Sequence, residues 1–149
     1  MGRIFVLDQE GIDALLRSAL VGRIACCAHD DDRPYLVPIP FGYDGESIYS
    51  ISGPGRKLDI MRNQPSVAFE VDVAEAEDRW QSVVADGEFE ELTHPKERLR
   101  AIEIVNPAAG IDAVSPDAIV YRIRLTRLSG RFEVPDAEAS RYENAMARR

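Results

Sequence analysis

The stretch from Tyr49 to Asn63, YSISGPGRKLDIMRN, constrains the fold more than any other part of the sequence. Apolar and polar residues alternate at its start, which predicts a strand, and the Gly-Pro-Gly sequence at 53–55 then reverses the chain. The apolar residues that follow recur at helical spacing until Gln64-Pro65. The stretch therefore predicts a strand, a tight turn and a short helix over 57–63 in immediate succession.

The same turn has the chemistry of an anion site. Glycines allow the backbone to approach a ligand, and the first N–H groups of a helix have no partner within the helix. Arg56 and Lys57 place two cations beside these groups, so a phosphate suits the arrangement. The alternative is an ordinary connection between a strand and a helix, with solvated Arg and Lys side chains, because basic turns are common.

Composition limits the classes of partner. The chain has 149 residues, enough for one domain with a core, and a net charge of −8 with a pI near 4.8 argues against binding to nucleic acid or anionic membranes. The adjacent Cys26 and Cys27 predict neither a disulfide framework nor a metal site, and we expect both in or near the core rather than in a redox role. Without a signal-peptide pattern or an apolar run of roughly 18 residues, the sequence predicts a cytoplasmic protein with no membrane span.

Periodicity and turn signals predict the N-terminal elements. We expect residues 1–7 to form a lead-in, and Asp8 to cap a helix that Gly22 ends, with Ile12, Leu15, Leu16 and Ala19 on one face. Asp44-Gly45 predicts a type I′ hairpin turn. The expected strands are 23–28, 34–43, 47–52 and 67–71, the last with Val67, Phe69 and Val71 on one face, separated in part by a solvated acidic loop at 29–33.

The C-terminal half continues the same alternation of strands and helices. After a charged connection at 73–79, we expect a strand over 80–92 in which Gly87 marks a bulge or a close backbone approach. Thr93 or His94 can cap a helix from Pro95 with an apolar stripe of Leu99, Ile102 and Val105. The strand at 119–128 and residues 130–134 complete the sheet, and the tail at 136–149 is a loose helix or disordered.

The predicted fold is mainly β, in the α+β class, with six to seven antiparallel strands and two to four short helices that plug a small barrel or closed sheet. A parallel α/β fold is disfavoured because hairpins leave no room for crossover connections.

Three stretches then line up along the chain: Val37 to Phe41, Ser52 to Lys57, and Trp80 to Val83 with Gly87 downstream. Their order resembles the split-barrel flavoproteins of the pyridoxamine 5′-phosphate oxidase-like superfamily, in particular the small nitroimidazole-reductase-like branch. The resemblance covers roughly residues 8 to 130. It implies an antiparallel split β-barrel, with one FMN-binding domain over 1–135 and a polar tail over 136–149.

The resemblance further implies an FMN site at the interface of a homodimer. Pro38, Ile39, Pro40 and Phe41 would match the strand whose backbone lies along the flavin ring. Ser52, Arg56 and Lys57 would match the positions that hold the ribityl chain and the phosphate. Trp80, Gln81, Ser82 and Val83 would match a second strand beside the cofactor, from the same or the other subunit.

The activity implied by this resemblance is an FMN-dependent oxidoreductase that passes electrons from a nicotinamide donor to a small acceptor, for which aromatic and nitro compounds are candidates. Ile51 stands where relatives often have a histidine, and neither His29 nor His94 is placed as a general acid or base, so no catalytic residue is assigned. A flavin-binding, storage or sensor protein without turnover is the alternative. A third is a split barrel that uses a deazaflavin coenzyme or haem. The chain lacks the C-terminal extension of true pyridoxamine phosphate oxidases, which argues against that specific substrate.

Overall fold

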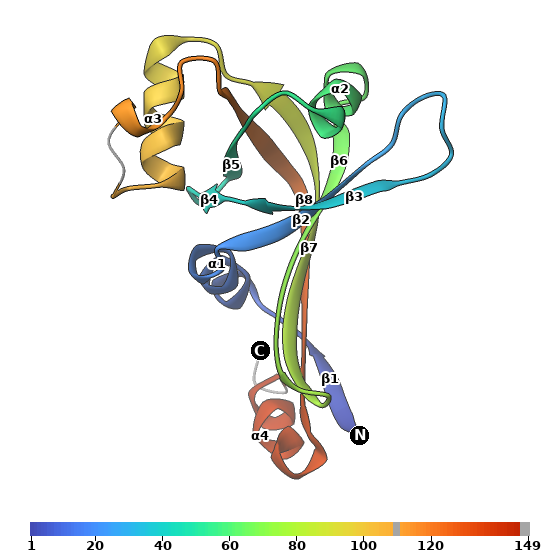
Figure 1. Ribbon diagram of the computed structural model, residues 1–149. Coiled ribbons are helices and arrows are strands. Elements are labelled where there is room, and N and C mark those ends of the chain that lie inside the picture. Colours follow the sequence, from blue (N-terminus) through green and yellow to red (C-terminus); the bar gives the residue numbers. More distant parts are fainter. Residues whose placement is uncertain (109–110, 147–149) are drawn as a thin grey trace.

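An antiparallel, strongly curled sheet of eight strands dominates the computed structural model, which describes residues 1–108 and 111–146 (Figure 1). The strands are β1 (Gly2–Val6), β2 (Val21–Cys26), β3 (Tyr35–Pro40), β4 (Gly42–Tyr43), β5 (Ser47–Ser52), β6 (Ser66–Ala76), β7 (Arg79–Glu91) and β8 (Ile119–Pro135). The helices are α1 (Gln9–Ser18), α2 (Arg56–Asn63), α3 (Pro95–Val105) and α4 (Asp136–Met146), with a 3-10 turn, η1, at Ile111–Ala113. The spatial order is β3-β2-β6-β7-β8-β5-β4, and β1 pairs with β8.

Two long strands connect the two ends of the molecule. β7 has 13 residues and β8 has 17, and they pair with each other from Trp80 and Glu133 at one end to Glu91 and Tyr121 at the other. Figure 1 shows α2 and α3 near the curled end of the sheet, whereas β1, α4 and the tip of the β6–β7 hairpin lie at the opposite end. The mainly β, split-barrel prediction is therefore confirmed.

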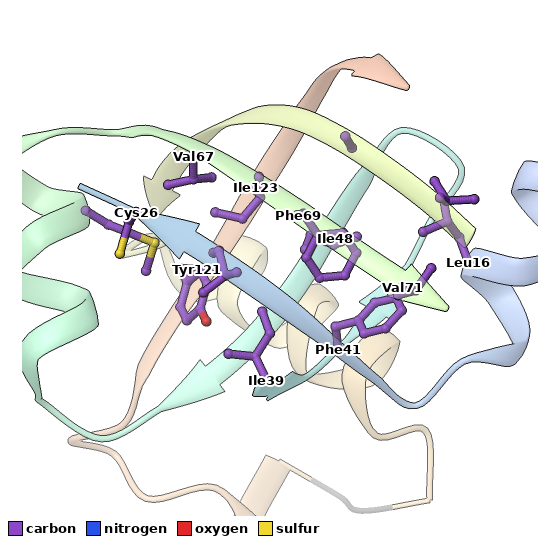
Figure 2. Close-up of a cluster of buried hydrophobic side chains, with 14 of the residues drawn as sticks. Leu16, Cys26, Ile39, Phe41, Ile48, Val67, Phe69, Val71, Tyr121 and Ile123 are labelled. Atoms are coloured by element: carbon purple, nitrogen blue, oxygen red, sulfur yellow. The ribbon is translucent and has the colours of Figure 1, made fainter. Parts of the chain in front are cut away.

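The hydrophobic core fills the inside of the curled sheet. Val67, Phe69 and Val71 alternate along β6 and are all buried, as the period of a strand requires. The ring of Phe69 packs edge to face against that of Phe41, with the ring centroids 5.0 Å apart (Figure 2). A smaller cluster lies beneath α3 and consists of Tyr49, Leu92, Ala101, Ile102 and Val120.

Helix α1 has the predicted start but an earlier end. The Asp8 carboxylate accepts the Gly11 N–H at 2.9 Å, which caps the helix, and Ile12, Leu15 and Leu16 are buried. The prediction that Gly22 ends the helix is wrong, because α1 ends at Ser18 and Gly22 lies within β2. A side chain at Gly22 would collide with the Phe69 ring. The glycine is therefore explained by the close approach of β2 to the core.

The hairpin at Asp44-Gly45 forms, but its turn is not type I′. Gly45 has a φ of 103°, and no residue other than glycine has a positive φ among those the structure describes, whereas a type I′ turn needs two such residues. The Asp44 carboxylate instead accepts the N–H groups of Glu46 at 2.9 Å and Ser47 at 2.8 Å. A side chain therefore closes this turn, as Asp often does next to a glycine.

Two segments predicted as irregular are strands, and the tail, predicted as a loose helix or disordered, forms a helix. The lead-in at 1–7 contains β1, which pairs with β8 and stacks Phe5 on Phe132 at 5.5 Å. The charged connection at 73–79 is mostly the tip of the β6–β7 hairpin, because cross-strand pairing continues to Ala76 and Arg79. The tail forms α4 up to Met146, and residues 147–149 lie outside the described part.

Other boundaries moved for local reasons. The predicted strand 34–43 is divided at Phe41, whose side chain turns into the core, and 119–134 is one continuous strand. Helix α3 is capped by His94, whose ring Nδ1 accepts the Lys96 N–H at 3.2 Å, but it buries Ala101 and Ile102 and leaves Leu99 exposed. Of the two cysteines expected near the core, Cys26 is buried and Cys27 is exposed.

Gly87 occupies the predicted bulge, where the β7–β8 register shifts between Asp86 and Gly87. An added Cβ would collide with the Ile123 side chain and lie 2.9 Å from the Arg124 carbonyl oxygen. We expect Gly87→Ala to lower the free energy of unfolding by about 1–3 kcal/mol through overpacking. Gly53→Ala is the matched control, because a Cβ there meets no atom within 4 Å. Urea denaturation checks this, and equal stability of the two variants would contradict it.

Candidate functional site

The turn between β5 and α2 presents an open helix start. Gly55 is the N-cap residue of α2, and without a side chain it makes no capping hydrogen bond to the first turn. A Cβ at Gly53 or Gly55 would meet no atom within 4 Å. The space around the first N–H groups of α2 can therefore admit a ligand, and anions are the ligands that such groups favour.

Two of the three residues predicted to bind phosphate are in direct contact. The Lys57 ammonium donates to the Ser52 hydroxyl oxygen at 2.7 Å, and this hydroxyl donates to the Gly53 carbonyl oxygen at 2.8 Å. Ser52 lies at the last position of β5 and Lys57 in the first turn of α2, so the local fold brings them together. The contact positions the ammonium beside the open turn.

Arg56, the third residue, is held by partners that the sequence did not indicate. Its guanidinium lies over the Tyr35 ring, 5.2 Å from the ring centroid, and one nitrogen is 3.5 Å from an Asp31 carboxylate oxygen. The acidic loop at 29–33 is mostly exposed, as predicted, and Asp31 in addition pairs with Arg56. Asp31 and Arg56 are 25 residues apart, and no local sequence pattern connects them.

Arg56 and Lys57 also affect the pKa of the buried Cys26 thiol. Burial raises its pKa, as does the neighbouring Cys27, whereas Arg56 and Lys57 act to lower it. Its sulfur lies 3.8 Å from the Tyr35 carbonyl oxygen. The cationic turn therefore sits close to the edge of the hydrophobic core, where charges are screened less than on an open surface.

Strand β3 divides the predicted ring-binding residues between two faces. Ile39 and Phe41 are buried in the core, whereas Pro38 and Pro40 are exposed on the outer face. Only the backbone of the two buried residues remains for contact with a flat ligand. The Ser50 hydroxyl donates to the Pro40 carbonyl oxygen at 2.7 Å and joins the end of β3 to β5.

The second predicted strand lies at the far end of the molecule. Across β8, Ser52 pairs with Ile119 and Trp80 pairs with Glu133, fourteen residues further along. An extended strand of that length spans up to about 46 Å. Gln81 and Ser82 are half-buried beside Trp80, and Val83 is fully buried in the core. One chain therefore does not bring Trp80 and Gln81 together with the β5–α2 turn.

A hollow of about 790 Å³ lies beside Trp80 and Gln81. Apolar side chains from β1, β6, β8 and α4 form much of its lining, including Val6, Val73, Phe132 and Tyr142. The Trp80 indole N–H donates to a Glu133 carboxylate oxygen at 2.6 Å, which fixes the indole at the rim. Sequence reasoning singled out Trp80 and Gln81 but missed the hollow, because β1 and α4 were not predicted to cover this end.

The family model for pyridoxamine 5′-phosphate oxidase matches residues 8–132, most of the chain. The chain belongs to this family. The match covers α1 through most of β8, and so includes the β5–α2 turn and the Trp80 strand.

Solved structures share the fold of this family member. A FAD-binding protein from Mesorhizobium loti is 30% identical, with a TM-score of 0.73 over 87% of this chain and 97% of that chain. A candidate 5-nitroimidazole antibiotic resistance protein from Bacteroides thetaiotaomicron is 20% identical, with a TM-score of 0.75 over 89% of each chain. An uncharacterised protein from Rhizobium meliloti (strain 1021) is 36% identical over 87 residues, which cover 58% of this chain and only 56% of that relative.

No helix within residues 1–108 and 111–146 is long and apolar enough to cross a membrane. Across the same residues, no group of three or more His, Cys, Asp or Glu side chains is placed to hold a metal ion.

The position of α2 depends in part on one ion pair with β7. Both Arg62 donors, Nε and Nη2, reach the Glu91 carboxylate at 2.9 Å, and this hydrogen bonding holds the pKa of Glu91 below its ordinary value. We expect Glu91→Gln to lower the free energy of unfolding at neutral pH by about 0.5–1 kcal/mol, since the pair is partly exposed.

The pH dependence has a defined sign. Because the folded-state pKa of Glu91 is lowered, its stabilisation is present above the unfolded-state pKa and is lost as the pH falls through the folded-state value. Urea denaturation at neutral pH and at about pH 3 should therefore show a smaller difference between Glu91→Gln and the parent at the lower pH. An equal difference at both pH values would mean that the carboxylate charge has no part in stability.

Proposed function

We propose that the protein is a flavin-dependent oxidoreductase that holds a flavin nucleotide by its phosphate at the β5–α2 turn. One observation carries the proposal: the uncapped start of α2 lies open beside a Lys57 ammonium that Ser52 positions at 2.7 Å. Membership of the pyridoxamine 5′-phosphate oxidase family supports it.

The residues at the turn fit a flavin phosphate. Backbone N–H groups, an ammonium, a guanidinium and a hydroxyl are the donors that phosphate oxygens accept, and glycines leave room for the group. Pro38 and Pro40 offer exposed apolar surface on β3 for a flat ring. The alternative is a plain turn with solvated cations; against it stands Lys57, which is half-buried and held on Ser52.

A bound flavin would supply the hydride and electron chemistry that no side chain supplies alone. The chain's own residues would bind and orient it and exclude water. Ile51 is half-buried and packs against the cluster beneath α3, so the position where relatives often have histidine offers no proton donor. We propose a nicotinamide donor and a small acceptor, with aromatic and nitro compounds as candidates, because a site without an acid or base suits hydride transfer.

FMN and FAD share the ribityl phosphate that the turn would hold. The family resemblance implies FMN, whereas the Mesorhizobium loti protein at 30% identity is described as FAD-binding. Either flavin is compatible with the donors of the turn. An absorption spectrum of the purified protein, with mass identification of any released cofactor, distinguishes these flavins from a deazaflavin and from haem.

Flavin binding without turnover is the second candidate function, and the apolar Ile51 is the observation that favours it. A storage or sensor protein needs a site but no reaction. Oxidation of NADH or NADPH by the flavin-loaded protein, measured with a panel of quinone and nitroaromatic acceptors, separates the two functions. Consumption above the rate of free flavin supports the oxidoreductase, and tight binding without consumption supports the storage or sensor role.

We further propose that two copies of the chain share each site. The turn with Arg56 and Lys57 lies at one end of β8, and the hollow beside Trp80 and Gln81 lies at the other. A two-fold dimer can place the turn of one copy against the hollow of its partner, because such interfaces match one patch to another reciprocally. The wide separation of the two predicted groups within one chain supports this arrangement.

Replacing both cations tests the phosphate position. We expect Arg56→Ala with Lys57→Ala to weaken FMN binding at least tenfold, about 1.4 kcal/mol, because charge-assisted hydrogen bonds to phosphate are lost. The quenching of flavin fluorescence measures the dissociation constant. The matched control is Lys96→Ala with Arg124→Ala, which removes two exposed cations elsewhere. Equal FMN affinity of the two double variants would place the phosphate elsewhere.

Mixed dimers test the shared site. The Arg56→Ala, Lys57→Ala chain and a Trp80→Ala chain are each expected to bind FMN weakly as homodimers. A heterodimer of the two would contain one site with both defects and one intact site, if each site takes its turn and its Trp80 strand from different copies. We therefore expect co-expressed, differently tagged chains to recover tight binding at half the sites.

The contrary outcome is equally clear. If each site came from one chain, every site in the heterodimer would carry one defect, and no tight binding would return. Light scattering provides the necessary second measurement, since a monomer that binds FMN tightly would rule out a shared site.

A further inference from the structure

The acidic loop between β2 and β3 supplies a third charge to the cationic turn. One Asp31 carboxylate oxygen lies 3.5 Å from Arg56 Nη2, and the other accepts the Arg33 N–H at 3.0 Å. The Asp31 N–H also donates to the Ala28 carbonyl oxygen at 3.4 Å. The loop therefore holds Asp31 in place, and Arg56 lies between this carboxylate and the Tyr35 ring.

The charges in contact at the turn sum to one positive charge. Arg56 and Lys57 contribute two, and Asp31 removes one. A phosphate bound by Arg56 must lie close to the Asp31 carboxylate, because both contact the same guanidinium. A ligand with a second negative charge on the same phosphorus is therefore poorly balanced.

We propose that Asp31 is a specificity-determining residue that disfavours the terminal phosphate of FMN relative to the diphosphate of FAD; this inference rests on the proposed flavin site. A phosphate monoester carries a charge of about −1.5 to −2 at neutral pH. Each phosphate of the FAD diphosphate has one ester bond and one anhydride bond, and it carries one negative charge. A turn with one net positive charge matches a singly charged phosphate better, so Asp31 biases the choice between two flavins that share every other contact there.

Coulomb's law gives the scale of the bias. At a separation of about 6 Å in an environment close to water, one extra unit of negative charge beside a carboxylate changes an affinity about three- to tenfold. In FAD the second charge resides on the next phosphate, further from Asp31, so its repulsion is smaller. The bias is therefore modest in size and specific in direction.

The experiment compares riboflavin, FMN and FAD at about pH 8, where the FMN phosphate is fully dianionic. We expect Asp31→Asn to tighten FMN binding about three- to tenfold and FAD binding by a smaller factor. Riboflavin, which has no phosphate, should be unaffected. Asp32→Asn is the matched control, since it removes the same charge from an exposed neighbour in the same loop, and it should change all three affinities less than about twofold.

Asp31→Glu separates charge from loop structure, because it keeps the carboxylate while altering the local packing. It should retain the parent ratio of FMN to FAD affinity. Equal gains for FMN and FAD in Asp31→Asn, or gains no larger than those of Asp32→Asn, would overturn the inference and leave the flavin site standing. If the unaltered protein binds none of the three compounds, the proposed function fails and the inference fails with it.

Discussion

The pairing of β8 on both of its edges determines where every other part of the molecule lies. Along one edge β8 pairs with β7, and along the other it pairs first with β5 and then with β1. Backbone hydrogen bonds of this kind allow no gradual sliding, because a shift by one residue would move each buried side chain to the solvent face. The turn after β5 and the hollow beside β7 are therefore placed at fixed, opposite ends of one strand.

Helix α2 gives the cationic turn a rigid base. Leu58 and Met61 are fully buried, and burial of such side chains contributes about 1.5–3 kcal/mol each. The helix thus presents Arg56 and Lys57 from a surface that the core holds in place. Asp31, by contrast, comes from an irregular loop whose contacts are mostly with its own backbone. The protein thus combines two cations on a rigid helix with the Asp31 carboxylate on a loop, and loops tolerate substitution. The affinity for a phosphate and the selectivity between phosphates can therefore vary independently.

Local patterns predicted what local forces determine. The cap at Asp8, the bulge at Gly87 and the strand, turn and helix around Gly55 depend on neighbours in the sequence, and they are found as predicted. Ser52 and Lys57 are five residues apart, so their association also follows from the turn itself. Contacts between distant segments were not predicted. The residues around Phe5 do not indicate a strand partner in β8, and those around Asp31 do not indicate an ion pair with Arg56. The predicted roles of Trp80 and Gln81 stay predictions, since one chain leaves them far from the turn.

The separation of these two groups also affects how a cofactor would act on the protein. If a flavin bridges the turn of one copy and the hollow of another, then it binds the dimer and not the separated chains. Linkage requires that each event strengthens the other, so flavin would stabilise the dimer by as much as dimerisation improves flavin binding. The net charge of −8 also favours assembly that depends on the cofactor, because two acidic copies repel each other. A contact between the basic turn and its partner offsets part of this repulsion. Cofactor loading and assembly would then be one equilibrium, set by the geometry of β8.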